Sequence, residues 1–171
     1  MNDLCKKATD IFHEKGPSDA AYWLLMQRQA LVLNQWEMCK LAQSLGLTPT
    51  GFILWPNMLT FRYERWLVSY DCTLCDADKL YHLARSIGFF LNEAEHFEAN
   101  PCDEYLYCDD EGVTRAFAMA LCLPKPLLLE KIDRGEHRLE ILGYFNQSEE
   151  RVSERLKEFG RELPETRYCP R

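Results

Sequence analysis

Residues 76–91, DADKLYHLARSIGFFL, carry the pattern that decides the fold. Apolar side chains recur there every three or four residues, as on the buried face of an α-helix; they are Leu80, Leu83, Ala84, Ile87 and Leu91. The opposite stripe, at positions i, i+3, i+4 and i+7, holds His82, Arg85, Ser86 and Phe89. The sequence therefore predicts a helix with one buried face and one mixed polar and aromatic face.

The residues before this helix change pattern. Helical spacing in 2–14 predicts a short helix, and the spacing from residue 18 predicts a long helix through Trp36 that continues or bends towards Leu45. Aromatic and β-branched residues then fill 50–55 and 60–70, on either side of a turn at Pro56-Asn57. This part is predicted to form two or three strands of a small antiparallel sheet.

Helical spacing returns after residue 112. It predicts helices at 113–122 and 127–134, and a helix pair at 136–145 and 148–159. The expected fold is α+β and mostly helical, with a small antiparallel sheet packed on a helical core and a C-terminal helix pair. We expect an N-terminal helical extension, a main domain and a frayed tail, at 1–35, 36–163 and 164–171.

The composition of the 171 residues is that of a globular protein, with 47% hydrophobic and 27% charged residues. A formal net charge of −7 argues against a broad basic surface for nucleic acid. No apolar run resembles a secretory signal or reaches the roughly 20 residues of a membrane helix. We therefore expect a cytoplasmic protein whose eight cysteines are mostly buried thiols.

The negative charge is concentrated in the connection at 92–112. This segment contains no Lys or Arg, and its eight acids are Glu93, Glu95, Glu98, Asp103, Glu104, Asp109, Asp110 and Glu111. Subtracting these eight from the 27 acids leaves 19, against 20 bases, so the rest of the chain is nearly neutral. Because aromatic residues such as Tyr105 and Tyr107 are interleaved with the acids, the connection is predicted to form a packed lid or a protein-binding surface.

Three segments, in order, resemble the ImmA/IrrE family of zinc metallopeptidases. LARSIGFFL (83–91) resembles the family's active-site helix, A-H-E-x-G-H-x-x-L. RAFAMALCLP (115–124) resembles its E-A-N-x-F-A-x-x-L-L-x-P helix, and 139–160 resembles its closing helix pair. The resemblance covers roughly 36–163 and implies a zincin-like helical core.

The metal-binding residues of that family are missing. In an HExxH helix, two histidines bind zinc and the glutamate is the general base; these positions hold Arg85, Phe89 and Ser86 here. Val113 stands where the family has its third ligand, a glutamate. Arginine stays protonated, while phenylalanine and valine have no donor atom, so we predict a pseudoenzyme with no metal, no cofactor and no catalytic residues.

Active members of the family cut or inactivate helix-turn-helix repressors, often on phages or other mobile elements. The resemblance implies a regulatory or host-interaction protein that binds another protein, such as a helix-turn-helix regulator or a host defence protein, and neither nucleic acid nor membrane directly. The candidate partner-binding residues are His82, Arg85, Asp103, Glu104, Tyr105, Tyr107, Asp109, Asp110 and Glu111. We expect an internal salt bridge from Arg85 to the acidic connection.

Two other functions stay open from the sequence. The acidic connection would suit an inhibitor that mimics nucleic acid and blocks a nucleic-acid-binding or defence protein. A metalloprotease with relocated ligands is the other, for which the thiols of Cys72/Cys75 and Cys102/Cys108 are the available soft donors. A redox role for Cys72 and Cys75 is disfavoured, because Asp71 and Asp76 flank the pair and oppose thiolate formation.

Overall fold

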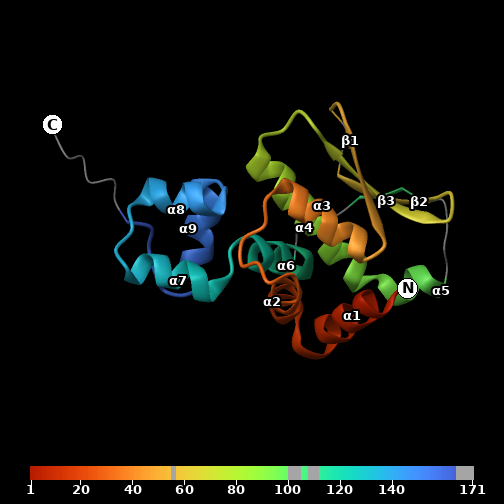
Figure 1. The fold of residues 1–171 in the computed structure, drawn as a ribbon, viewed down its shortest axis with the longest axis horizontal. Helices are drawn as coiled ribbons and strands as arrows, with labels where there is room; N and C mark the ends of the chain where they lie inside the picture. The colour runs from red at the N-terminus through yellow and green to blue at the C-terminus, as the bar shows by residue number, and fades with distance from the viewer. Residues whose placement is uncertain (55–56, 100–104, 108–111, 165–171) are drawn as a thin grey trace.

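The structure is a computed structural model, which describes residues 1–54, 57–99, 105–107 and 112–164. Its helices are α1 (Asp3–Lys15), α2 (Pro17–Arg28), α3 (Gln35–Ser44), α4 (Asp76–Asn92), α5 (Ala94–Ala99), α6 (Gly112–Cys122), α7 (Lys125–Asp133), α8 (Arg138–Phe145) and α9 (Glu149–Lys157). Its strands are β1 (Leu47–Phe52), β2 (Met58–Arg62), β3 (Arg65–Asp71) and β4 (Tyr105–Tyr107). The expected α+β, mostly helical class is confirmed (Figure 1).

The sheet is mixed, which corrects the expectation of a wholly antiparallel one. The strand order is β1-β3-β2-β4. β2 and β3 form an antiparallel hairpin that turns at Tyr63 and Glu64, both at positive φ. β3 lies between β1 and β2 in the sheet and runs parallel to β1, with Leu47 opposite Trp66 and Phe52 opposite Asp71.

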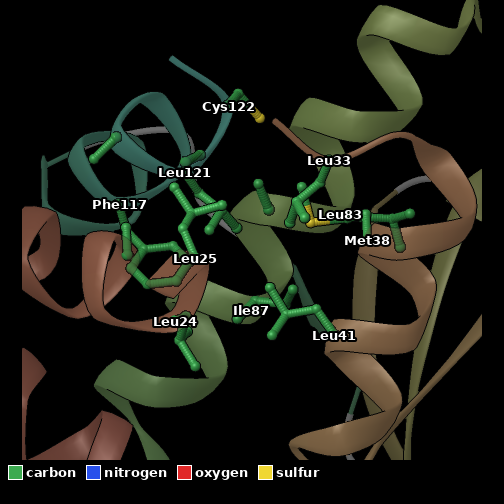
Figure 2. Packing of buried hydrophobic residues seen from close by; sticks show 14 of the residues in the cluster. Leu24, Leu25, Leu33, Met38, Leu41, Leu83, Ile87, Phe117, Leu121 and Cys122 are labelled. Carbon is green, nitrogen blue, oxygen red and sulfur yellow. The ribbon is translucent and has the colours of Figure 1, made fainter. Parts of the chain in front are cut away.

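Helix α4 lies at the centre of the core. The predicted burial of its apolar face is confirmed, because each of the five apolar residues on that face is at most 1% exposed. Figure 2 shows Leu83 and Ile87 of α4 packed among side chains of α2, α3 and α6. Gly88 allows the close approach of α6, since a Cβ at this position would lie 3.0 Å from the Cβ of Phe117. Packing at this density leaves no room for a larger residue.

The long helix expected from residue 18 through Trp36 is wrong, because the chain breaks between α2 and α3. Gln29 ends α2 in the left-handed conformation, with a φ of 54°. Asn34 then starts α3 with a capping box, in which its side chain accepts from the Glu37 N–H and the Glu37 carboxylate accepts from the Asn34 N–H. Local hydrogen bonds at 29–34 therefore outweigh the continuous apolar period.

Residues 1–35 share the core of the rest of the chain. Buried side chains of α1 and α2, such as Phe12 and Leu24, belong to the same hydrophobic cluster as those of α4 and α6. Leu163 packs against this cluster too, and 165–171 of the expected tail lie outside the described residues. The domain boundaries proposed from the sequence stay a prediction.

Helices α7, α8 and α9 lie together on the side of α6 away from the sheet (Figure 1). Ser148 is the N-cap of α9, as its sequence position suggests, and its hydroxyl accepts from the Arg151 N–H. Arg151 donates to Asp78 Oδ1 at 2.6 Å, and its guanidinium lies 4.2 Å from the ring centroid of Tyr81. Polar contacts to the first turns of α4 therefore fasten this end of the molecule.

No single helix of the described residues is long and apolar enough to cross a membrane. Within the same described residues, one bent pair, α6 and α7 taken together, passes that test of length and composition, with a 51° bend between the two helices.

Candidate functional site

The residues aligned with a peptidase motif are placed on α4 and at the start of α6. Ser86 is fully buried and Arg85 is 8% exposed, while Phe89 is half-buried and its ring centroid lies 6.1 Å from that of Phe97. Val113 is 44% exposed in the first turn of α6. The helix face that would hold a metal and a water is therefore occupied by packed side chains.

Ser86 takes part in a hydrogen-bond network between α4 and the sheet. Its hydroxyl lies 2.8 Å from Oδ1 of Asn57 and 3.1 Å from the main-chain oxygen of His82, so two acceptors compete for one proton. The Nδ2 of Asn57 donates to the same His82 oxygen at 3.1 Å. Where the resembled family has its general base, this chain has a tie between α4 and the segment that enters β2.

The chemistry of the donor set does not fit zinc. A peptidase zinc needs three side chains with neutral nitrogen or anionic oxygen or sulfur donors. Arg85, Phe89 and Val113 supply none of these. Across the part of the chain that the structure describes, no three His, Cys, Asp or Glu side chains gather in a way that could hold a metal ion.

A second tie fixes the connection after β1. The Oδ1 atom of Asp71 accepts hydrogen bonds from the Leu54 N–H at 3.1 Å and from the Thr73 N–H at 2.9 Å. The Thr73 hydroxyl adds a third donor at 2.6 Å. The hydrogen bonds from Thr73, with a smaller contribution from the Leu54 N–H, lower the pKa of Asp71 below its ordinary range. Asp71 therefore joins the β1–β2 connection to the β3–α4 connection as a carboxylate.

The chain exposes apolar side chains up to the residue that bonds to Asp71. Phe52, Ile53 and Leu54 are 47%, 74% and 80% exposed. Leu54 has a φ of 51°, a left-handed conformation that a leucine adopts only at a cost. Consecutive exposed apolar residues that are held in a strained conformation are typical of a binding surface rather than of a solvated loop. We call residues 52–54 the apolar loop.

The predicted partner-binding residues are only partly described. His82 and Arg85 lie on α4, but Asp103, Glu104, Asp109, Asp110 and Glu111 lie outside the described residues, so the expected salt bridge from Arg85 to the acidic connection stays a prediction. Tyr105 and Tyr107 belong to β4, whose backbone pairs with β2 opposite Thr60 and Met58. The connection at 92–112 thus contains α5 and β4.

The described cysteines differ in exposure. Cys72 and Cys75 are exposed, and Cys75 Sγ lies 3.2 Å from Oδ2 of Asp78. Cys5 and Cys122 are buried, and burial raises the pKa of Cys122 to about 12. Cys102 and Cys108 lie outside the described residues, so metal binding by that pair stays untested.

Sequence reasoning missed Asp71, which bonds to the apolar loop, and Asn57, which bonds to α4. The sequence predicts only a turn at Asn57, and Pro56 beside it lies outside the described residues. An Asp followed two residues later by Thr at a strand end is an available signal, because such side chains bond to nearby N–H groups. The partner across the chain, Leu54, has no such local signal.

Comparison with known proteins leaves the family open. No family model matches the chain, and no curated protein matches it. A solved structure with a similar fold is a Mycobacterium tuberculosis transcriptional regulator, with a TM-score of 0.59 and 15% identity over 99% of this chain and 54% of the regulator. This chain thus spans about half of the regulator's length, and at such low identity the two are similar in fold alone.

Proposed function

We propose that this protein is a non-catalytic regulator, built on an inactive fold of the ImmA/IrrE kind, that acts by binding another protein. The observation that carries the proposal is the state of the α4 face. Arg85, Ser86 and Phe89 replace the ligands and the base, and the hydroxyl at the position of the base bonds to Asn57 instead of activating water. The fold likeness to a transcriptional regulator supports a regulatory role.

The apolar loop is the binding surface that the described residues favour. Burial of its exposed apolar area would contribute about 25 cal/mol for each Å² removed from water. A loop that is already bonded to Asp71 through the Leu54 N–H loses less entropy on binding, which favours affinity. A helix-turn-helix regulator or a host defence protein is the partner that the resemblance implies.

Zinc measurement tests the loss of the metal site. The protein is purified without added metal, and its zinc content is measured by mass spectrometry before and after incubation with one equivalent of Zn²⁺ and dialysis. We expect less than 0.1 zinc per chain, a roughly tenfold margin below a filled site, because three ligands are absent. One tightly held zinc per chain would contradict the proposal.

Restoring the ligands tests the resemblance itself. The triple variant R85H/F89H/V113E places the family's ligands at the aligned positions, and R85H/F89H serves as the control with two ligands. We expect about one zinc per chain in the triple variant and much weaker binding in the control, with circular dichroism to confirm folding. A folded triple variant without zinc would show that these positions do not converge, whatever the native protein binds.

Partner binding is tested through the apolar loop. Proteins retained by the immobilised wild type are identified, produced in pure form and titrated against L54D, with Y63S as control because Tyr63 is 84% exposed at the opposite end of the sheet. Loss of binding by at least about tenfold in L54D alone would agree with a hydrophobic contact. Equal affinity of L54D and wild type would remove the loop from the interface.

A further inference from the structure

A cavity of about 510 Å³ lies where α2, the junction of α6 and α7, and α9 meet. Its lining includes no residue of α4 and none of the apolar loop. Its walls combine apolar and cationic groups, among them Tyr22, Pro124, Lys125, Pro126, Arg155 and Phe159. The volume is within the range of pockets that hold small molecules, roughly 300–1,000 Å³.

Arg155 is the polar group that the cavity leaves incompletely bonded. The residue is 6% exposed, and its Nε donates to the main-chain oxygen of Leu123 at 3.4 Å while Nη1 pairs with the Glu158 carboxylate. A guanidinium has five N–H donors. Across the described residues its Nη2 has no protein acceptor, and it is not among their buried unbonded atoms, so it is open to solvent where Arg155 lines the cavity. A guanidinium N–H that is open to the cavity can donate a charge-assisted hydrogen bond to an anionic ligand there.

Lys125 brings a second positive charge to the same cavity. Its ammonium lies 4.9 Å from the ring centroid of Phe159, and the guanidinium of Arg155 lies 4.8 Å from that ring. Lys125 is exposed, and the structure gives it no carboxylate partner among the residues it describes. It is also the first residue of α7, whose N-cap Pro124 offers no side-chain hydrogen bond, so the helix dipole adds to the positive potential.

Two carboxylates also line the cavity. Glu158 is already paired with Arg155, and Asp19 lies in the first turn of α2, where a helix dipole partly balances its charge. Lys125 and the Nη2 of Arg155 are therefore the cationic groups left to a ligand, and Ser18 and Tyr22 also line the cavity. These cationic groups are surrounded by apolar surface that suits the apolar part of a ligand; it comes from Pro124, Pro126, Tyr22 and Phe159.

We propose that this cavity binds a small organic anion, a carboxylate on a flat apolar body. The carboxylate accepts from Arg155 Nη2 and from Lys125, and the body packs between the proline rings, Tyr22 and Phe159. An inorganic anion would meet the same donors without the apolar contacts, and an uncharged analogue would give Lys125 and the Nη2 of Arg155 no anionic acceptor. This site is independent of the proposed protein-binding function.

The test uses benzoate as the probe, with benzamide as its uncharged analogue and inorganic phosphate as an anion without an apolar body. Binding to the full chain is followed by chemical shift changes in ¹H–¹⁵N spectra, including the side-chain Nε–H of Arg155. We expect saturable shifts at Arg155 and around Lys125 with benzoate, and binding at least about tenfold weaker for benzamide and for phosphate.

Variants locate the site. K125M removes one cation from an exposed position, so it is expected to fold and to weaken benzoate binding about tenfold. K131M is the matched control, because Lys131 is on the same helix and also lies over an aromatic ring, 3.9 Å from the centroid of Tyr144. Absence of saturable benzoate binding, equal binding of benzamide, or an equal effect of K131M would each overturn the proposal.

Discussion

Asp71 shows how one carboxylate can fix two connections at the end of a sheet. Its three donors come from Leu54 and Thr73, seventeen and two residues away in the sequence. They favour the ionised form, so the pKa of Asp71 is lower in the folded protein than in the unfolded chain. The contribution to stability is therefore present above the unfolded pKa and is lost as the pH falls through the folded pKa.

This linkage predicts the acid behaviour of D71N. The amide oxygen can still accept from the N–H groups but does not titrate, so D71N is expected to be less stable than wild type at pH 7 and to lose less stability below about pH 4. Urea unfolding at a series of pH values from 7 to 3 measures the effect. T73V, which removes only the hydroxyl donor, is expected to have a stability at pH 7 between those of wild type and D71N. Parallel stability–pH curves for wild type and D71N would contradict the assignment.

Gly88 is the residue that sets the distance between α4 and α6. In G88A the new Cβ would lie 2.9–3.1 Å from three side-chain atoms of Phe117, which forces a shift in a packed core. We expect the free energy of unfolding to fall by about 1–3 kcal/mol. G143A is the control, because Gly143 is in α8 with nothing within 4 Å of its Cβ position, and alanine there should stabilise by up to about 1 kcal/mol. Thermal unfolding of both variants measures these changes. Equal stabilisation by G88A and G143A would show that helix propensity, and not tight packing, controls the effect of alanine at Gly88.

At the scale of elements, the break between α2 and α3 is controlled by caps rather than by periodicity. The Asn34 capping box supplies acceptors for N–H groups that an interrupted helix leaves unbonded. N34A is expected to lower the free energy of unfolding by about 1 kcal/mol. Q43A, an exposed change within α3, should stay within about 0.5 kcal/mol of wild type. If chemical denaturation gave the same loss for both, the cap would have no special role.

At the scale of the whole molecule, arginines of α9 fasten the C-terminal helices to the rest. Arg151 bonds to Asp78, and partial burial on its own would raise the pKa of that carboxyl. The hydrogen bonds from Arg151 and Cys75 and the charge of Arg151 outweigh burial, and the pKa of Asp78 is lowered. Arg115 of α6 pairs with Glu154 of α9 in addition. The joint between the two parts is therefore more polar than the core around α4.

Removal of one arginine tests this joint. R151M is expected to cost about 1.5–3 kcal/mol, because it removes a charge-assisted hydrogen bond and leaves Asp78 without its cation. Hydrogen exchange should then increase in α7–α9 more than in α4. R134M is the control, since the Arg134–Glu130 pair is exposed and should contribute no more than about 0.5 kcal/mol. Uniform exchange across the chain in R151M would contradict a separate joint.

Much of the fold follows from local pattern. The stripe in 76–91, the helix at 113–122 and the pair near the C-terminus were predicted with ends within a few residues, because apolar spacing and capping residues act over short stretches. The order of the strands was not, because β3 enters between β1 and β2 through pairing that no single stretch encodes. The caps at Gln29 and Asn34 are local features of the sequence. The apolar period continues across them, however, and predicts a helix without a break at these residues.

The sequence by itself determined one chemical fact about the candidate site: Arg85, Phe89 and Val113 carry no atom that can bind zinc. Only the tertiary structure decided what those positions do instead. The Ser86 hydroxyl meets Asn57 from 29 residues away, and Arg155 meets the Leu123 carbonyl from 32 residues away. Residue type fixes which bonds an atom is able to make, whereas the fold fixes which atoms come within reach of it.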